Sequence, residues 1–291
     1  KTVGLAFDDG ACPAMTPEEY CQQKAAASGS SFYYSFLFLP PERRRAITAL
    51  YAYCREVDDV VDECTDAGVA RRKLAWWREE VANLYAGKPQ HPVTQALACA
   101  VLTYDIQQQH MLELIDGMAM DLDYNRYPDF DTLKLYCHRV AGVVGLMSAA
   151  IFGFGDRRTL EYASELGLAF QLTNIIRDVG EDARRNRIYL PLDELQQFGV
   201  AEADVQAARE SESFQKLMTF QITRAESHYD AAFARLPAED RKPQIPGIIM
   251  AAIYRTLLDE IRRDGCQVLK HRTSLTPIRK LWIAFRTWVK H

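Results

Sequence analysis

The sequence predicts an all-α protein that folds as one domain. Helical periodicity, broken at short intervals by Pro and Gly, covers nearly all of the 291 residues, and strand signals are scarce. No internal repeat, low-complexity tract or linker divides the chain. We therefore expect residues 15–291 to form a single helical domain, and residues 1–14 to be an unstructured lead or a cloning remnant.

Start and stop signals place the helices in order. Thr16, followed by Pro17 and two glutamates, is typical of a capped helix start. The expected helices span residues 41–64, 67–86, a segment that opens at 92, then 104–124, 130–152, 157–182, 211–235 and 239–264, with a basic loop at 183–191. The uncharged run 140–155 is shorter than the roughly 20 residues that cross a bilayer. It is therefore expected to be a buried helix.

Composition and charge exclude several classes of function. The chain has 35 basic and 39 acidic residues, a net charge of -4, which is not the basic footprint of a nucleic-acid-binding protein. Its seven cysteines include no CxxC pair, which favours reduced thiols and a cytoplasmic chain. Six histidines without an HExxH motif argue against a zinc site.

The first candidate site is a pair of aspartates in the segment ALYAYCREVDDVVDE. Asp58 and Asp62 are four residues apart, so on a helix they stand one turn above each other. The surrounding valines predict a partly buried face, where an uncompensated charge is costly. A divalent cation would resolve this conflict, because magnesium is typically held by one or two carboxylates plus substrate phosphate. Taken alone, the spacing of these two aspartates fits a solvated acidic helix face better than a metal site.

The second candidate site is a polar stripe on an otherwise apolar helix. Gln171, Asn174, Asp178 and Asp182 follow at intervals of three and four, and each step of four rotates only about 40° around a helix. A solvated face would normally carry Lys or Glu instead. Two such stripes that faced each other would hold a cluster of magnesium ions, which would bind a diphosphate and stabilise it as it leaves.

Arginines stand where a diphosphate would need them. Arg55 precedes Asp58 by one turn, and the second stripe is accompanied by Arg177, Arg184, Arg185 and Arg187. The planar guanidinium binds two phosphate oxygens at once. Ion pairs with the neighbouring aspartates also explain the presence of these arginines. Ion pairing and diphosphate binding can both occur in one protein.

Two long segments resemble the squalene/phytoene synthase family: ASGSSFYYSFLFLPPERRRAITALYAYCREVDDVVDE and LAFQLTNIIRDVGEDARRNRIYLP. They occur in the family's order, about 110 residues apart, and the resemblance covers about residues 17–280. Within the family, YCQQKAAASGSSFYYSF and RKLWIAFRTW are most similar to bacterial presqualene diphosphate synthases of hopanoid pathways.

The resemblance implies a helical isoprenoid-synthase fold around a central cavity and assigns roles to residues. It implies magnesium binding by Asp58, Asp62, Asn174, Asp178 and Asp182. It implies that the aspartates act in catalysis together with Tyr51, Arg55 and Tyr136. It implies substrate binding by Ser28, Ser31, Phe32, Gln171, Asn174, Arg177, Arg187, Tyr254 and Arg272. One frequent serine position of the family is Gly29 here, so Ser28 or Ser30 would replace it, and Arg272 matches with one gap.

The implied reaction joins two farnesyl diphosphates into presqualene diphosphate, with Tyr136 or the released diphosphate as the proton acceptor. Apolar cavity walls would come from Phe32, Phe36, Leu37, Val140, Val144, Leu146, Leu166 and Phe170, which an ordinary core explains equally well. Gly142 and Gly145 would leave room for a prenyl tail or allow two helices to approach closely.

Several alternatives stay open. The product could be phytoene, dehydrosqualene or, with NADPH, squalene; NADPH is not expected, because no GxGxxG follows a strand. A non-catalytic lipid-binding relative would be expected to lack aspartates in one stripe. A class I terpene cyclase would carry a different triad in place of NIIRDVGED. The amphipathic, basic segment 279–290 fits either a helix at the inner membrane surface or a last helix packed on the domain. The oligomeric state stays open.

Overall fold

The computed structural model describes residues 15–27 and 32–291, with only the backbone of Tyr33. Every regular element in these ranges is helical, which confirms the predicted all-α class. The elements are α1 (Pro17–Ala27), α2 (Phe32–Phe36), α3 (Pro41–Glu63), α4 (Ala67–Tyr85), α5 (Pro92–Thr103), α6 (Gln108–Asp123), α7 (Phe130–Cys137), the π-helical turn η1 (His138–Gly142), α8 (Val143–Phe152), α9 (Arg158–Arg184), α10 (Leu192–Gln197), α11 (Glu202–Gln206), α12 (Glu212–Arg235), the 3-10 turn η2 (Ala238–Asp240), α13 (Ile245–Arg263) and α14 (Pro277–Lys290).

Side-chain caps begin several helices where the sequence indicates. At α1 the Thr16 hydroxyl accepts from the Glu19 amide at 3.2 Å, while the Glu19 carboxylate accepts from the Thr16 amide at 2.8 Å. This reciprocal pair satisfies two amides that a helix start otherwise leaves without partners. Asp66 and Asp129 cap α4 and α7 in the simpler one-sided way.

Three predicted helix boundaries were wrong. The helix expected from residue 104 begins at Gln108, because the chain first makes a turn in which Asp105 has φ 50°. The loop expected from residue 183 begins later, since α9 continues through Arg184. The helix expected from residue 239 begins at Ile245, where Pro246 occupies a first-turn position that needs no amide donor.

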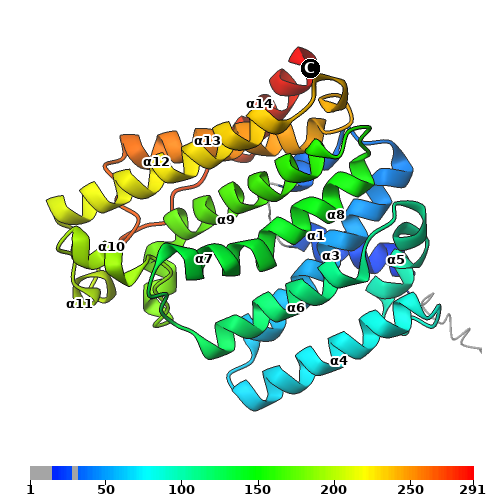
Figure 1. Cartoon of the computed structure of the whole chain (residues 1–291), viewed down its shortest axis with the longest axis horizontal. Coiled ribbons are helices and arrows are strands. Elements are labelled where there is room, and N and C mark those ends of the chain that lie inside the picture. Colours follow the sequence, from blue (N-terminus) through cyan, green and yellow to red (C-terminus); the bar gives the residue numbers. More distant parts are fainter. Residues whose placement is uncertain (1–14, 28–31) are drawn as a thin grey trace, which may run out of the picture.

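Helix α9 runs through the middle of the molecule. In Figure 1, α8 and α9 lie centrally, α12 and α13 lie on one side, and α6 and α4 lie on the other. One hydrophobic cluster surrounds α9, α12 and α13, and a second surrounds α3 to α6. Phe32 and Val140 pack against both clusters. The polar stripe of α9 is therefore held between these two clusters.

Glycines let α8 and α9 come very close together. A Cβ on Gly145 would lie 2.2 Å from the Ala163 carbonyl oxygen, and one on Gly167 would lie 2.4 Å from that of Ala141. Of the two interpretations of Gly145, close helix approach is therefore the one that the packing supports. Near Gly142, the added Cβ would meet the ring of His138 instead.

The segment Phe130–Phe152 is long and apolar enough, by length and composition, to cross a membrane. It is the continuous run of α7, η1 and α8, and it packs between α6 and α9. With packed helices on both sides, the segment occupies the position of an interior helix of the fold. The π-helical turn inside it exposes Val140 and Ala141 to a cavity.

Candidate active site

A cavity lies between α3, α8, α9 and the start of α13. At one end it is polar, where Arg55, Asp58, Gln171 and Asn174 line it. Further in, its walls include six of the eight apolar residues predicted for this role: Phe32, Phe36, Val140, Val144, Leu166 and Phe170. Two wall predictions were wrong: Leu37 is 38% exposed, and Leu146 does not line the cavity.

The cavity is closed at its far end by α9 and α13. Tyr162 stands there beside Gly247, and a Cβ on Gly247 would lie 2.9 Å from the Tyr162 hydroxyl. This hydroxyl is buried and has no hydrogen-bond partner. Gln244 completes the end and is anchored by its amide, which donates to the carbonyls of Ala149 at 3.2 Å and Gly153 at 2.9 Å.

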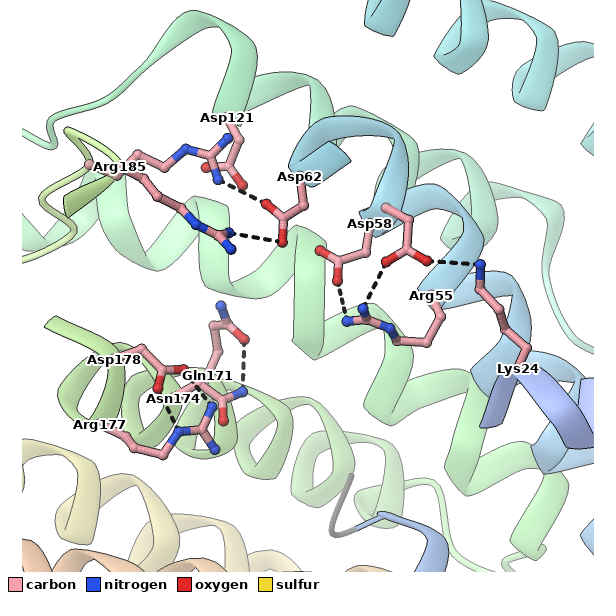
Figure 2. A network of polar contacts seen from close by, with 12 residues as sticks. Lys24, Arg55, Asp58, Asp62, Asp121, Gln171, Asn174, Arg177, Asp178 and Arg185 are labelled. Atoms are coloured by element: carbon pink, nitrogen blue, oxygen red, sulfur yellow. Dashed lines mark hydrogen bonds and ion pairs between the residues drawn. The ribbon is translucent and has the colours of Figure 1, made fainter. Parts of the chain in front are cut away.

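The first stripe lies on α3 and is partly neutralised by cations. Arg55 bridges Asp58 at 2.5 Å and Asp59 at 2.7 Å, and Lys24 of α1 bridges Asp59 at 2.8 Å (Figure 2). Burial, reinforced by Asp62 and other nearby carboxylates, raises the pKa of Asp58 to about 7 despite the opposing Arg55. The carboxylate of Asp58 thus has less positive charge around it than it needs to ionise readily.

The second stripe lies on α9 and faces the first across the polar end of the cavity (Figure 2). Arg177 and Arg272 each donate to Asp178 at 2.7 Å. Burial acts to raise the pKa of Asp178, but these two arginines hold it below its usual range. One turn on, burial and the charge of Asp178 raise the pKa of Asp182 to about 7.

Asn174 sits between these aspartates and the cavity with one oxygen unsatisfied. Its amide nitrogen donates to Gln171 at 3.4 Å, but its Oδ1 is buried without a partner. An unpaired buried acceptor normally costs stability. It is therefore a natural position for a ligand that donates to oxygen or is coordinated by it.

Arginines from the loop after α9 connect the two stripes. Arg187 donates to Asp62 of α3 at 3.1 Å, and Arg185 lies 3.5 Å from the same carboxylate. The charge of Arg187 also acts on Asp182 and on Asp121. One guanidinium is therefore shared by acids of α3, α6 and α9.

Asp121 of α6 was missed by the sequence analysis. It accepts hydrogen bonds from the hydroxyls of Tyr136 at 2.9 Å and Tyr189 at 2.8 Å. Burial raises its pKa to about 6, although Arg187 and the two hydroxyls act in the opposite direction. The signal was in the sequence, since Asp121 continues the buried stripe of Leu114 and Met118 by one further turn, where an apolar residue would be expected.

Aromatic rings stand where the polar end meets the apolar walls. The rings of Phe32 and Tyr51 are 5.6 Å apart, and those of Phe170 and Tyr254 are 5.1 Å apart. Tyr254 also lies beside Arg177, whose charge partly offsets the rise in the tyrosine pKa that burial causes. These side chains screen the charged groups from the interior.

The structure thus brings most of the predicted site residues to one place. Those that line the cavity are Phe32, Tyr51, Arg55, Asp58, Tyr136, Gln171 and Asn174. Those connected to its polar end by ion pairs or electrostatic contacts are Asp62, Arg177, Asp178, Asp182, Arg187, Tyr254 and Arg272. Ser28 and Ser31 lie outside the described residues.

The side chains suit a hard cation, although they are not gathered around one point. Within residues 15–27 and 32–291, no three Asp, Glu, His or Cys side chains meet closely enough to ligate one ion. The candidate donors are nevertheless all carboxylate or amide oxygens, which magnesium prefers. The unpartnered Asn174 oxygen and the raised pKa values of Asp58 and Asp182 both indicate missing positive charge. The residues therefore fit magnesium accompanied by a bridging phosphate.

Comparison with known proteins identifies the family. The sequence profile described as "Squalene/phytoene synthase" matches residues 25–279. The chain belongs to the squalene/phytoene synthase family. Members are prenyltransferase-type enzymes that condense prenyl diphosphates head to head, so the chain is of this enzyme type.

Similar proteins are known by sequence and by structure. A phytoene synthase from Arthrospira platensis is 38% identical over 284 residues, which is 92% of each chain. A 15-cis-phytoene synthase from Synechocystis is 36% identical over 94% of this chain and 84% of its own. Among solved structures, a ligand-bound dehydrosqualene synthase has a TM-score of 0.83 at 26% identity, covering 94% of this chain and 96% of its own. The squalene synthase HpnC from Alicyclobacillus acidocaldarius has a TM-score of 0.75 at 26% identity, covering 86% and 94%.

Proposed function

We propose that this family member joins two farnesyl diphosphates into presqualene diphosphate, as in squalene and hopanoid biosynthesis. The length of the cavity carries the choice of a C15 substrate. Its α9 wall extends from Asn174 to Tyr162, twelve residues, or about 18 Å at the rise of a helix. Its α3 wall extends from Asp58 to Ile47, eleven residues, or about 16 Å.

The prenyl chains can be compared with this length. From C–C bonds of about 1.5 Å, an extended farnesyl main chain spans roughly 14 Å and an extended geranylgeranyl main chain roughly 19 Å. With the diphosphate held between the stripes, the C15 chain ends before Tyr162. The C20 chain would have to bend or displace that ring.

Ionisation of the first substrate is assisted by arginines at the polar end. In our proposal Arg55, Arg177 and Arg187 donate to the diphosphate oxygens as the C1–O bond breaks and its electron pair leaves with the diphosphate. Magnesium, held by Asp58, Asp62, Asn174, Asp178 and Asp182, would supply further charge neutralisation for the leaving group. The arginines that now contact these aspartates would then be able to turn to the diphosphate.

Carbon–carbon bond formation takes place in the apolar part of the cavity. The double bond between C2 and C3 of the second farnesyl chain attacks C1 of the allylic cation, and loss of one proton closes the cyclopropane. The products are presqualene diphosphate, one diphosphate and one proton. Phe32, Phe170 and the other walls exclude water, which would otherwise trap the cation as an alcohol.

Tyr136 is the proposed first acceptor of that proton. Tyr136 lines the cavity, and its hydroxyl donates its own proton to Asp121, which leaves a lone pair on the tyrosine oxygen available. The tyrosine can take the proton from the cation as it passes its own to the carboxylate. Asp121, with a pKa near 6, is ionised at neutral pH and can receive it.

Phytoene synthesis from C20 diphosphates is the second candidate, and the names of the curated relatives favour it. Dehydrosqualene, the product named for one structural neighbour, is a third. A non-catalytic lipid-binding role fits less well, because the two stripes together keep their four aspartates and Asn174.

The test is to incubate the purified protein and magnesium with the C15 or the C20 diphosphate, with and without NADPH, and to identify the lipids. Presqualene diphosphate from the C15 substrate without NADPH is expected. Phytoene from the C20 substrate alone would overturn the chain-length proposal. If neither substrate reacts and Asp58→Ala still binds prenyl lipids normally, the protein is a binding protein.

A further inference from the structure

Helix α14 carries an apolar ridge on its outer face. The ridge consists of Ile278, Leu281, Trp282, Phe285, Trp288 and Val289, all of them exposed, with Ile278 at 80% and Trp282 at 62%. They follow one another at intervals of three and one, which confines them to about 120° of the helix circumference. Such a concentration of large apolar side chains on a surface normally marks an interaction site.

The opposite face of α14 fixes the helix on the domain, so the ridge is not exposed through loose packing. Ala284 is fully buried, and Ile283 packs against the larger core cluster. Arg279 bridges Glu260 of α13 at 2.7 Å. Trp288, at the edge of the ridge, stacks on Phe38 with ring centroids 5.2 Å apart.

The charge of α14 opposes that of the whole chain. Its sequence PIRKLWIAFRTWVK contains four basic residues and no acidic one, whereas the protein has a net charge of -4. Arg286 and Lys290 are exposed and four residues apart, which places them together along one flank of the ridge. An apolar face with aromatic residues and a basic flank is the pattern of helices that lie in the interface of anionic membranes.

Helix α14 also begins near the polar end of the cavity, because the charges of Arg177 and Arg272 act on its Lys280. Lys280 lies over the ring of Tyr34, 5.7 Å from its centroid, and α14 packs on α2. Two α2 residues, Phe32 and Phe36, line the cavity itself. A membrane on the ridge would therefore lie close to the cavity in which the prenyl diphosphate is proposed to bind.

We propose that the α14 ridge docks the protein on a bilayer that contains anionic lipids. A bilayer accounts for both features at once, since its interior takes the apolar side chains and its anionic head groups attract the basic flank. The inference concerns where the enzyme works and does not depend on which prenyl product it makes.

The experiment measures binding of the full chain to phosphatidylcholine vesicles with and without phosphatidylglycerol, by flotation and in the absence of substrate. We expect binding that requires phosphatidylglycerol and weakens as salt is added. The pair Trp282→Ser and Phe285→Ser should weaken it at least tenfold. The pair Arg286→Gln and Lys290→Gln should weaken it by about fivefold per charge. Leu102→Ser removes a side chain that is 84% exposed on α5, and this matched control should bind normally.

Two further measurements keep the proposal falsifiable. All variants should turn over detergent-dispersed substrate at the normal rate, since no altered residue touches the cavity. Vesicle binding that is absent, indifferent to phosphatidylglycerol or unaffected by the Trp282 and Phe285 changes would overturn the proposal. Sedimentation in which those changes dissociate a dimer without reducing vesicle binding would show that the ridge joins two copies instead.

Discussion

Arg187 donates to Asp62 at 3.1 Å and so joins the loop after α9 to the first aspartate stripe on α3. The same guanidinium acts electrostatically on Asp182 and Asp121. It supplies positive charge that these carboxylates need. With substrate bound, it is placed to turn from Asp62 to a diphosphate oxygen.

Arg187→Gln should therefore lower kcat/KM by roughly 10²- to 10³-fold, the usual effect of removing one donor to a developing anion. Steady-state kinetics with the C15 diphosphate measure this. Arg185→Gln is the matched control, because Arg185 is mostly exposed and lies 3.5 Å from the same carboxylate. Equal losses in the two variants would contradict a specific role for Arg187.

Asp121→Asn should lower kcat by about 10²- to 10⁴-fold, because it removes the proposed final proton acceptor. The pH profile is the more specific measurement. Burial raises the pKa of Asp121 to about 6, so the acceptor is ionised above that pH and protonated below it. At saturating magnesium and substrate, kcat of the unaltered enzyme should therefore rise with pH through about 6, and the variant should lose this step.

If Asp121→Asn still shows the rise in kcat near pH 6, that rise belongs to the titration of another group. The exposed neighbour Asp123, which pairs with Arg71, offers the control substitution Asp123→Asn. That variant should keep both the rate and the profile.

Tyr162→Ala should lengthen the cavity and shift the preference from C15 towards C20 diphosphate by about tenfold or more, on the scale of one to several methylene contacts. Competition between the two substrates gives the ratio of C15 to C20 turnover. It is measured at low temperature, because removal of a buried ring destabilises the fold. Tyr162→Phe keeps the ring and removes only the unpartnered hydroxyl, so its ratio should stay within about threefold of normal. An unchanged ratio in Tyr162→Ala would show that the cavity end does not limit chain length.

Asp240→Asn should destabilise the fold by about 1–3 kcal/mol. Asp240 is buried and accepts from the Thr159 hydroxyl at 2.6 Å and from the amides of Gly155 and Asp156, so it ties η2 to the start of α9. Burial acts to raise its pKa, but these donors hold it below the usual value. Its stabilisation is therefore present above the unfolded pKa of about 4 and is lost as pH falls through the lower folded value.

Urea unfolding at neutral and acidic pH measures this contribution. The difference between the unaltered protein and Asp240→Asn should shrink as the pH is lowered. Glu239→Gln, one residue away on the exposed side of the turn, should leave the unfolding free energy within about 0.5 kcal/mol. A difference between the unaltered protein and Asp240→Asn that does not change with pH would contradict the hydrogen-bonded carboxylate as its source.

The helices and the two stripes could be predicted from the sequence because they are local patterns. Spacings of four residues place Asp58 with Asp62 and Asn174 with Asp178 whatever the rest of the chain does. A turn that depends on one residue in an unusual conformation leaves no periodic signal in the sequence. The turn at Asp105 is of this kind, and the start of α6 was misplaced for that reason.

Contacts between distant elements could not be predicted in this way. The pairing of Arg272 with Asp178 joins residues 94 positions apart, and Asp121 meets Tyr189 across 68 positions. The close approach at Gly145 and the closed cavity end at Tyr162 likewise depend on how helices pack. A stripe on one helix shows which groups are present, but only the packing shows which of them share a proton or a cation.

The most direct test of the proposed function is one competition assay. Equal amounts of C15 and C20 diphosphate are supplied with magnesium and without NADPH, and the products are separated and identified by mass. The proposed function predicts that presqualene diphosphate dominates, and that Asp58→Asn and Asp182→Asn abolish it while the fold is retained. Phytoene as the main product, or undiminished turnover in both aspartate variants, would contradict it.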